Sequence, residues 1–303
     1  MPAFYKEAQS RLQHQGAIKS VVRDIEGCYP AMPKEAIRLA LREVAARIKR
    51  EQGYTGVWVP RRATTKPCQW KYRGSKTSVQ WLSFEVMLDV MGFALDNAFV
   101  QMPDGQILRQ TLGIPMGDPL SPGMTIGTCG WMEDLWMAAL ADKHKQYFMA
   151  KRYMDDILLF YVERADWDHA RFLADFEESQ CYWPPLRLEQ GHEAQFLESQ
   201  FFIEENVIRF RLKNANESGK AVWRYHHYES YSQFQQKRAT LMACLRKVSK
   251  VASDNEQLWI SAVAKLDEFR QLGYPRSLRT YACAIQGRDT RNTTWFRVRA
   301  HQK

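Results

Sequence analysis

The most informative stretch of this 303-residue chain reads Tyr147-Phe-Met-Ala-Lys-Arg-Tyr-Met-Asp155-Asp156-Ile-Leu-Leu-Phe-Tyr161. An apolar segment, a turn bearing two acids and a second apolar segment predict a β-hairpin with carboxylates at its tip. Two adjacent carboxylates cost free energy unless a cation neutralises them. Mg²⁺ is suited, because it takes hard oxygen ligands from one or two carboxylates and from substrate phosphates. By spacing alone, an Asp-Asp pair is more often a simple turn.

A third acid stands near the end of an upstream segment. Ser20-Val-Val-Arg-Asp24-Ile is short and β-branched, and it predicts a strand that ends near a carboxylate. If this strand lies beside the hairpin, Asp24 joins Asp155 and Asp156. Three acids on neighbouring strands suit two metal ions about 3.5 to 4 Å apart, which activate an attacking hydroxyl and stabilise a leaving pyrophosphate oxygen.

Apolar periodicity and turn residues predict the other elements of the chain. Helices are predicted over residues 33–48, 81–99, 121–144, 166–180, 241–252 and 253–273. Loop-rich or hairpin segments are predicted over residues 52–84, 102–106 and 196–213, the last turning near Glu205-Asn206. Predicted helix starts are Ser121 and the capping box Ser253-Asp-Asn-Glu256. A mixed β/α body is therefore followed by a helical C-terminal end.

Charge is distributed unevenly along the chain, which has 43 basic and 34 acidic residues and a net charge of +9. Residues 231–303 hold 14 Lys and Arg against 5 Asp and Glu, and residues 52–84 hold six basic residues and no acidic one. The rest of the chain is net acidic. Two basic zones around an acid-rich middle are expected of a protein that holds a polyanion and binds cations at its centre. On charge alone, a merely soluble basic protein is the simpler interpretation.

The six cysteines are dispersed, with no Cys-x-x-Cys pair and no histidine at zinc-ligand spacing. We interpret them as reduced, buried thiols of an intracellular protein. The N-terminal residues lack the pattern of a signal peptide, and no stretch approaches the roughly 18 apolar residues of a membrane span. We therefore expect no membrane partner.

Four motifs, in order along the chain, resemble those of reverse transcriptases. Tyr153-Met154-Asp155-Asp156 is similar to the catalytic hairpin of that family, and Asp24-Ile-Glu-Gly-Cys-Tyr29 is similar to its first metal motif. Gln110-Thr-Leu-Gly-Ile-Pro-Met-Gly-Asp-Pro-Leu-Ser-Pro122 resembles the glycine-rich motif that contacts template and incoming nucleotide. Phe196-Leu197-Glu198 resembles the primer-grip element. The finer features, including Gly273-Tyr-Pro275, are most similar to Penelope-like elements, which are relatives of telomerase.

This resemblance implies an α+β fold with a right-hand polymerase palm, an antiparallel sheet packed by helices. It implies that Asp24, Asp155 and Asp156 are the catalytic and metal-binding residues and hold two Mg²⁺ ions, or Mn²⁺ in their place. Tyr29 would abut the sugar of the incoming nucleotide and exclude a 2′-hydroxyl, with an ordinary core tyrosine as the alternative. The nucleotide-lining residues of the glycine-rich motif would be Gln110, Pro115, Met116 and Gly117. A plain turn is the alternative for its glycines.

The family's fingers section, which normally precedes the first metal motif and grips the triphosphate, is missing here or has moved. We expect the basic, aromatic insertion 52–84 to replace it in part. Its candidate phosphate contacts are Arg61, Arg62, Lys66, Lys71, Arg73 and Lys76, and its candidate stacking platforms are Trp58, Trp70 and Tyr72. A solvated basic loop is the alternative.

Two further departures from the family affect the expected chemistry. Asp118 stands where serine is common, and it either caps the next helix or adds a carboxylate near the site. No lysine is found for the motif that donates a proton to pyrophosphate. Arg187 is the nearest basic residue, and arginine scarcely gives up its proton. Slow turnover is therefore expected.

The basic helices after residue 231 are expected to form a thumb that follows the duplex backbone without reading its sequence. Candidate contacts to primer and template are Tyr153, Met154, Phe196, Leu197, Lys237, Arg238, Arg246, Lys247 and Lys250. An exposed helical face with no bound nucleic acid is the alternative for the helical residues.

The expected organisation has four parts: residues 1–51 start the palm, 52–84 form the fingers-like insertion, 85–213 complete the palm, and 214–303 form the helical thumb and basic tail. The predicted activity is RNA-directed DNA polymerisation by two-metal catalysis. Its partners would be a primed RNA or DNA template and deoxyribonucleoside triphosphates. One alternative is a weak or inactive nucleic-acid-binding protein derived from a reverse transcriptase. An RNA-dependent RNA polymerase is a weaker alternative, because Tyr29 argues against ribonucleotides.

Overall fold

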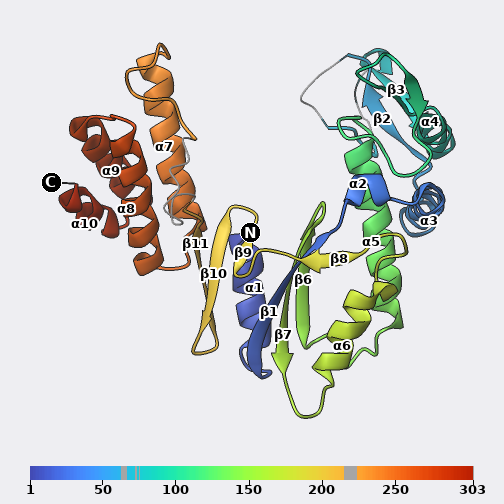
Figure 1. The fold of residues 1–303 in the computed structure, drawn as a ribbon, viewed down its shortest axis with the longest axis horizontal. Coiled ribbons are helices and arrows are strands. Elements are labelled where there is room, and N and C mark those ends of the chain that lie inside the picture. The colour runs from blue at the N-terminus through green and yellow to red at the C-terminus, as the bar shows by residue number, and fades with distance from the viewer. Residues whose placement is uncertain (63–66, 72–73, 75, 215–223, 303) are drawn as a thin grey trace.

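A four-stranded antiparallel sheet lies at the centre of the molecule (Figure 1), which is a computed structural model describing residues 1–62, 67–71, 74, 76–214 and 224–302. Its strands follow the order β6-β7-β1-β8. Their bounds are β1 (Ala17–Ile25), β6 (Phe148–Tyr153), β7 (Asp156–Glu163) and β8 (Leu188–Gln190). The predicted acidic hairpin is confirmed, since β6 and β7 pair as far as Tyr153 opposite Asp156.

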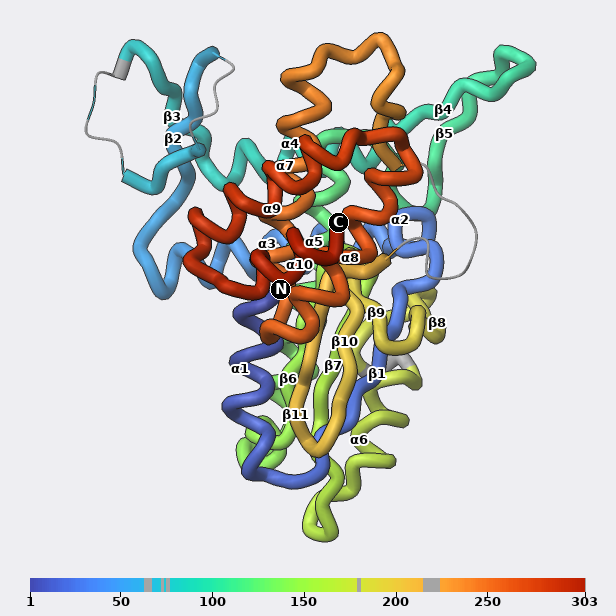
Figure 2. Tube along the Cα trace, turned by 90° about the vertical axis from the view of Figure 1, so that its left-hand side faces the viewer, coloured from blue at the N-terminus to red at the C-terminus, as the bar shows by residue number. Residues whose placement is uncertain are grey.

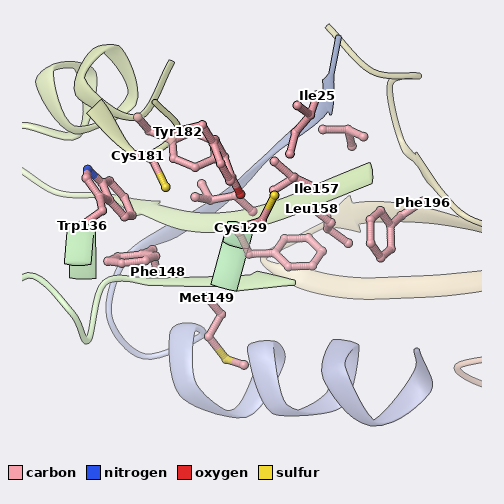
Figure 3. Packing of buried hydrophobic residues seen from close by; sticks show 14 of the residues in the cluster. Ile25, Cys129, Trp136, Phe148, Met149, Ile157, Leu158, Cys181, Tyr182 and Phe196 are labelled. Atoms are coloured by element: carbon pink, nitrogen blue, oxygen red, sulfur yellow. The ribbon is translucent and has the colours of Figure 1, made fainter. Parts of the chain in front are cut away.

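The continuous apolar run of β7 is buried because both faces of the sheet are covered. Successive strand residues point to opposite faces. The ring of Phe160 lies 6.0 Å from that of Tyr5 in α1 (Pro2–Leu12) and 5.4 Å from that of Phe201 in β10 (Ser199–Glu204). On the other face, the ring of Tyr161 stacks 5.9 Å from that of His169. That face is covered by α5 (Ser121–Ala139), α6 (His169–Asp175) and the π-helical turn η2 (Phe176–Gln180), whose packing is shown in Figure 3.

Helix α1 was not among the elements expected from sequence. It buries Tyr5, Ala8 and Leu12 on one side, against the sheet and the hairpin of β10 and β11 (Val207–Leu212). This hairpin turns at Glu205 and Asn206, as predicted, and β9 (Gln195–Phe196) adds a third strand on its other edge.

The insertion folds as a hairpin of β2 (Gly56–Pro60) and β3 (Val79–Ser83), with a 3-10 turn η1 (Lys76–Ser78), beside α3 (Lys34–Gln52) and α4 (Phe84–Asp96). The helix predicted from Trp81 starts later than expected. Trp81 lies in β3, and Ser83 caps α4 by accepting a hydrogen bond from the backbone N–H of Val86 at 3.3 Å.

A small hairpin, β4 (Phe99–Gln101) and β5 (Ile107–Arg109), closes around the predicted Asp-Gly turn and extends away from the body in Figure 2. All six strand residues are exposed, including Phe99 at 57% and Ile107 at 69%. This hairpin therefore gains no stability from a buried face.

The C-terminal helical unit consists of α7 (Phe234–Val251), α8 (Asn255–Gln271), α9 (Arg276–Thr290) and α10 (Thr294–His301). It has its own hydrophobic core, which includes Leu245, Leu266 and Trp295 and extends to Leu212 of β11. The cap of α8 is Asp254, one residue later than predicted, and its carboxylate accepts from the backbone N–H groups of Glu256 and Gln257 at 2.9 Å each.

The start and end of α5 also differ from the sequence prediction. Ser121 is its first helical residue rather than its cap, and it donates a hydrogen bond to the carbonyl of Pro115 at 2.8 Å. The helix ends at Ala139 instead of near residue 144, because Leu140 has an extended backbone.

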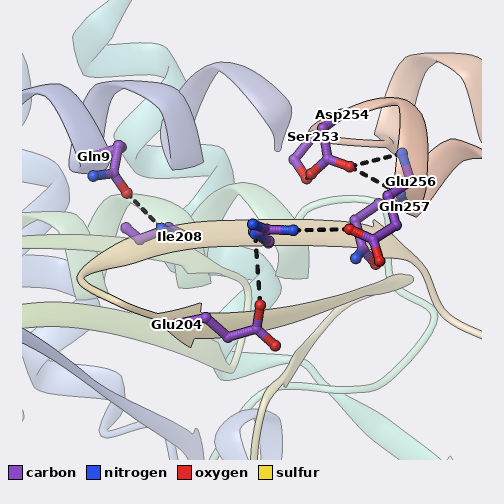
Figure 4. Close-up of polar contacts among 8 residues, drawn as sticks. Gln9, Glu204, Ile208, Ser253, Asp254, Glu256 and Gln257 are labelled. Carbon is purple, nitrogen blue, oxygen red and sulfur yellow. Dashed lines mark hydrogen bonds and ion pairs between the residues drawn. The ribbon is translucent and has the colours of Figure 1, made fainter.

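Figure 4 shows Glu204 of the hairpin and Glu256 near the start of α8, at the junction between the body and the helical unit. Arg209 of β11 bridges these two carboxylates. Its guanidinium is 3.5 Å from the Glu204 carboxylate and 3.0 Å from that of Glu256, next to the start of α8. The backbone N–H of Ser253 also donates to the carbonyl of Phe210 at 2.8 Å. The helical unit is thus bonded directly to the edge strand of the hairpin.

All six cysteines are free. Four are buried, whereas Cys244 is half-buried and Cys68 is exposed, so the expectation of buried thiols was wrong for these two. Within the described ranges, no helix combines the length and apolar character needed to cross a membrane.

Candidate active site

The acidic turn joins β6 to β7 through Met154 and Asp155. Met154 has φ of 58°, a left-handed backbone that costs a side-chain-bearing residue free energy. The carbonyl of Asp155 accepts a hydrogen bond from the backbone N–H of Ile25 in β1 at 3.1 Å. The turn is therefore held against the end of β1, where Asp24 lies.

Asp24 lies directly opposite Asp156 in the antiparallel register, so both side chains project from the same face of the sheet. The pKa of Asp24 is raised to about 6, chiefly by burial and then by the charges of Asp155, Asp156 and Glu189. The pKa of Asp156 is raised as well, by burial first and by Asp155 second. The structure thus brings the three predicted carboxylates together.

Glu189 was missed from sequence. It pairs with Asp24 from the other side, through β8, so Asp156, Asp24 and Glu189 form one acidic row across three strands. The alternation of Leu186 and Leu188 with Arg187 and Glu189 is the signal that could have indicated this short strand. The electrostatic influence of His192 opposes the upward shift of the Asp156 pKa.

The glycine-rich loop packs against the segment that carries Tyr29. The backbone N–H of Ile114 donates to the carbonyl of Tyr29 at 2.9 Å. Gly113 has φ of 73°, and a Cβ there would lie 2.3 Å from the carbonyl oxygen of Pro30. Glycine is required here because the two backbones touch. The loop predicted to line the nucleotide therefore adjoins the short helix α2 (Cys28–Ala31) that holds Tyr29.

Side chains of this loop differ in exposure. Met116 is 75% exposed and Gly117 is exposed with φ of 91°, whereas Pro115 and Gln110 are half-buried. The Lys34 ammonium, which sequence reasoning missed, donates to the carbonyls of Leu95 and Gln110 at 2.5 Å each. Lys34, in the first turn of α3, thus holds the backbone of Gln110 at the start of the loop.

Tyr29 is half-buried against the core, and burial is the main cause that raises the pKa of its phenol, followed by the charges of Cys28 and Asp155. Asp118, for which two roles were open, accepts a hydrogen bond from the backbone N–H of Leu120 at 2.7 Å. It therefore acts in the turn that leads into α5.

The turn that was predicted to resemble a primer grip, at Leu197 and Glu198, joins β9 to β10. Leu197 has φ of 54°, so this turn is also left-handed at a bulky residue. Phe196 does not fit a direct nucleic-acid contact, because only 1% of it is exposed and it packs in the core beside Leu158 (Figure 3). Tyr153, in contrast, is 61% exposed.

The basic residues of α7 divide into two groups. Lys237 does not fit a duplex contact, because it is 8% exposed and its ammonium donates to the carbonyls of Tyr228 and Ser230. Lys247 is paired with Glu198, which ties α7 to the turn of β9 and β10. Arg238 lies over the Tyr281 ring at 5.2 Å and is exposed, as are Arg246 and Lys250.

In the insertion, Arg61 and Arg62 are exposed, and the Arg61 guanidinium donates to the carbonyl of Val79 at 3.1 Å. The ring of Trp58 packs 5.3 Å from that of Trp81, and that of Trp70 stacks 5.2 Å from that of Tyr54. These indoles thus already contact other aromatic rings. Lys66, Tyr72 and Arg73, together with the side chain of Lys76, lie outside the described part of the chain.

The donor chemistry of the acidic row fits a hard divalent cation, because it offers only carboxylate oxygens whose mutual repulsion a cation relieves. Among the described residues, no group of three or more His, Cys, Asp and Glu side chains could by itself hold a metal ion. The magnesium site therefore stays a prediction.

No family model matches the sequence, and no curated protein matches it. The structure has a mixed α/β fold that is similar to solved telomerase structures. It is similar to telomerase from Candida albicans in complex with a fragment of telomeric RNA, with TM-score 0.61 and 12% identity over 99% of this chain and 49% of that one. It is also similar to apo telomerase from Candida tropicalis, with TM-score 0.55 and 13% identity over 99% and 48%. The chain thus spans about half the length of these telomerase chains.

Proposed function

We propose that this chain catalyses template-directed addition of deoxyribonucleotides to a primer 3′-hydroxyl, with RNA as the expected template. One observation carries the proposal: Asp24 and Asp156 face each other across two strands, beside a strained turn that presents Asp155. Clustered carboxylates with raised pKa values destabilise an unliganded protein, and such clusters are typical of functional sites. The likeness of the fold to telomerase supports the same class of reaction.

Asp24, Asp155 and Asp156 are the residues that would hold Mg²⁺, with triphosphate oxygens completing the coordination. When bound, the ions lower the barrier by stabilising the charge that develops on the attacking and leaving oxygens. The chain itself contributes positioning: β1 and β7 fix the carboxylates, and the contact between Tyr29 and Ile114 fixes the nucleotide-side loop. The half-buried Tyr29 ring excludes a 2′-hydroxyl by its size.

In this proposal the central sheet and the helices around it form the palm, and the α7–α10 unit forms the thumb. The insertion 52–84 replaces part of the fingers, with Arg61 and Arg62 as phosphate contacts. Arg246 and Lys250 follow the duplex backbone, because they are exposed on α7. The exposed Tyr153 and the left-handed Leu197 lie at turns that meet the primer end.

Primer extension tests the proposal, on matched RNA and DNA templates with deoxyribonucleotides or ribonucleotides and with Mg²⁺ or Mn²⁺. We expect metal-dependent incorporation of deoxyribonucleotides. The double variant Asp155→Ala, Asp156→Ala should lower it by at least about 10³-fold, since metal neutralisation supplies several kcal/mol. Asp89→Ala, at an exposed aspartate of α4, is the matched control and should retain full activity.

Duplex binding with no extension under any condition would favour the second candidate, a nucleic-acid-binding protein that has lost turnover. No lysine is found for the motif that donates a proton to pyrophosphate, and the nearest basic residue, Arg187, scarcely gives up its proton, which favours this candidate. Extension that survives the double variant would refute the assignment of the site.

A further inference from the structure

Arg152 immediately precedes the catalytic turn sequence and lies on the sheet face opposite to Asp156, since it pairs with Ile157. Its side chain is only 10% exposed. The guanidinium donates to the carbonyl of Met154 at 3.0 Å, within the turn itself, and to the carbonyl of Ile126 in α5 at 3.5 Å. One buried cation therefore contacts both the turn and a neighbouring helix.

Glu133 of α5 holds the same guanidinium from the other side. One carboxylate oxygen accepts from Nε of Arg152, and the second accepts from Nη2 at 3.3 Å, which makes the pair bidentate. The hydroxyl of Tyr182, a residue 2% exposed just after η2, donates to Glu133 at 2.6 Å. Arg152 is thus fixed by partners on α5 and beside η2.

The position of these bonds matters because of the backbone they contact. Met154 occupies a left-handed conformation that is unfavourable for a residue with a side chain and persists only where surrounding contacts impose it. The Met154 carbonyl bond is such a contact. Helix α5 begins at the end of the glycine-rich loop, so the same guanidinium also connects the turn to the element that follows the nucleotide-side loop.

We propose that Arg152, oriented by Glu133 and Tyr182, is a positioning residue that holds the Met154–Asp155 turn in its left-handed form and locks it to α5. Arg152 does not touch the reacting groups, and its effect on catalysis passes through Asp155. This inference deepens the proposed function and rests on it for its catalytic consequence. The geometry of the turn in the metal-free protein can be measured independently.

A matched comparison is available at the opposite end of the same hairpin. Arg164 also makes an ion pair, with Asp166, and a bond to a backbone carbonyl, that of Gln15 at 2.6 Å. Its side chain is 31% exposed, and it contacts no residue of the catalytic turn. Arg152→Lys and Arg164→Lys therefore make the same change at the two ends of one hairpin, because each replaces the several N–H donors of a planar guanidinium with a single ammonium.

The test combines hydrogen exchange with kinetics. In metal-free protein, Arg152→Lys should speed amide exchange in the peptide spanning residues 152–157 by at least about 10-fold, because the turn loses the bond that imposes its backbone. Where extension is measurable, kcat should fall by about 10- to 100-fold with the KM for nucleotide little changed, as expected for misplacement of a catalytic group. Tyr182→Phe, which removes one hydroxyl, should give the same pattern more weakly.

Arg164→Lys should leave both quantities at their wild-type values. If Arg152→Lys leaves exchange of the 152–157 peptide unchanged, the positioning role is wrong. Faster exchange of the whole sheet in both Arg152→Lys and Tyr182→Phe would assign the network to folding alone and would also overturn it. A wild-type protein that never extends a primer would refute the proposed function, while the exchange comparison would still decide the role of Arg152 in the turn.

Discussion

The carboxylate of Asp24 is repelled by its neighbours, because it stands between two other acidic positions and close to a third. Its raised pKa of about 6 means that the folded protein binds a proton more readily there than the unfolded chain does. Above about pH 6 the folded state therefore bears a cost from this carboxylate, and below about pH 4 that cost disappears. A bound cation would remove the same cost at neutral pH.

Replacing Asp24 with Asn should consequently stabilise the metal-free protein. We expect Asp24→Asn to raise the Tm near pH 8, because the amide has the size of the carboxylate without its charge. The difference in Tm from wild type should shrink as the pH falls from about 6 and vanish below about 4, where the wild-type carboxyl is protonated in both states. Thermal scans over this pH range measure it, and a constant difference would contradict the assigned charge repulsion.

Gly113 gives a second test at a single position. Gly113→Ala should destabilise the protein by about 3 kcal/mol, because it combines a left-handed backbone with a Cβ placed 2.3 Å from the Pro30 carbonyl oxygen. Gly105→Ala is the control, since Gly105 has φ of 88° but nothing within 4 Å of its Cβ position. It should cost only about 1 kcal/mol. Denaturant unfolding compares the two, and equal losses would mean that the close approach is not restrictive.

Some single residues were predicted from the sequence, and others were missed or wrongly placed. The proximity of Asp24, Asp155 and Asp156 could be predicted because each stands in a recognisable local pattern, and their role in binding metal stays a prediction. Glu189 was missed because its role depends on pairing with a strand more than 160 residues away, which no local pattern encodes. Lys237 was wrongly expected at the surface. Charge alone does not show that the ammonium of this lysine is buried and donates to two backbone carbonyls.

Helix α7 has one buried side and one exposed side. Leu241, Leu245 and Val248 form the buried stripe predicted from their spacing, and Arg246 and Lys250 project from the exposed side. If this side follows a duplex backbone, each phosphate contact contributes about one unit to the dependence of log affinity on log salt concentration. Lys237 is buried and bonded to two backbone carbonyls, so we expect its replacement to change stability and not duplex binding.

Arg246→Ala should therefore weaken duplex binding several-fold and reduce the salt slope by about 1, with little change in Tm. Lys237→Met should lower stability by about 1 to 3 kcal/mol, since it leaves buried carbonyls without donors, and it should keep the slope. Salt titrations of binding to an RNA–DNA hybrid, together with thermal scans, separate the two. An unchanged slope in Arg246→Ala would favour an exposed face with no nucleic acid.

Most elements were predicted in type, and their ends were predicted less well. The hairpins at 147–161 and 196–213 follow from apolar segments on either side of turn residues, and both are confirmed. The start of α4 depends on one hydrogen bond, which the Ser83 hydroxyl accepts from the backbone N–H of Val86, and the end of α5 depends on the extended backbone of Leu140. Helix α1 was missed because the stripe that it buries is short and mixes tyrosine with alanine.

The molecule has two hydrophobic cores that meet at the β10–β11 hairpin. Phe210 belongs to the core of the sheet, and Leu212, two residues later, belongs to the core of the helical unit. The fold class was readable from sequence, since a mixed β/α pattern is followed by helical stripes. The way in which the helical unit meets the body was not, because it rests on Arg209, Glu204 and Glu256, whose spacing suggests nothing.

Two cores should give two unfolding transitions. Leu245→Ala should lower the transition of the helical unit by about 2 to 5 kcal/mol, and Phe160→Ala should lower that of the sheet by about 3 to 5 kcal/mol. Each variant should leave the other transition almost unchanged. Scanning calorimetry tests this, and a single transition that both variants shift equally would show that the two cores unfold together.

The β4–β5 hairpin affects how the protein behaves in concentrated solution. Its strands are three residues long, low in charge and apolar on both faces, so either edge can pair with another copy and gain burial in doing so. Colloidal stability should therefore fall with concentration faster than the net charge of +9 alone would suggest. A lysine in place of Ile107, at 69% exposure, is the mildest change that should improve solubility, and light scattering would measure the gain.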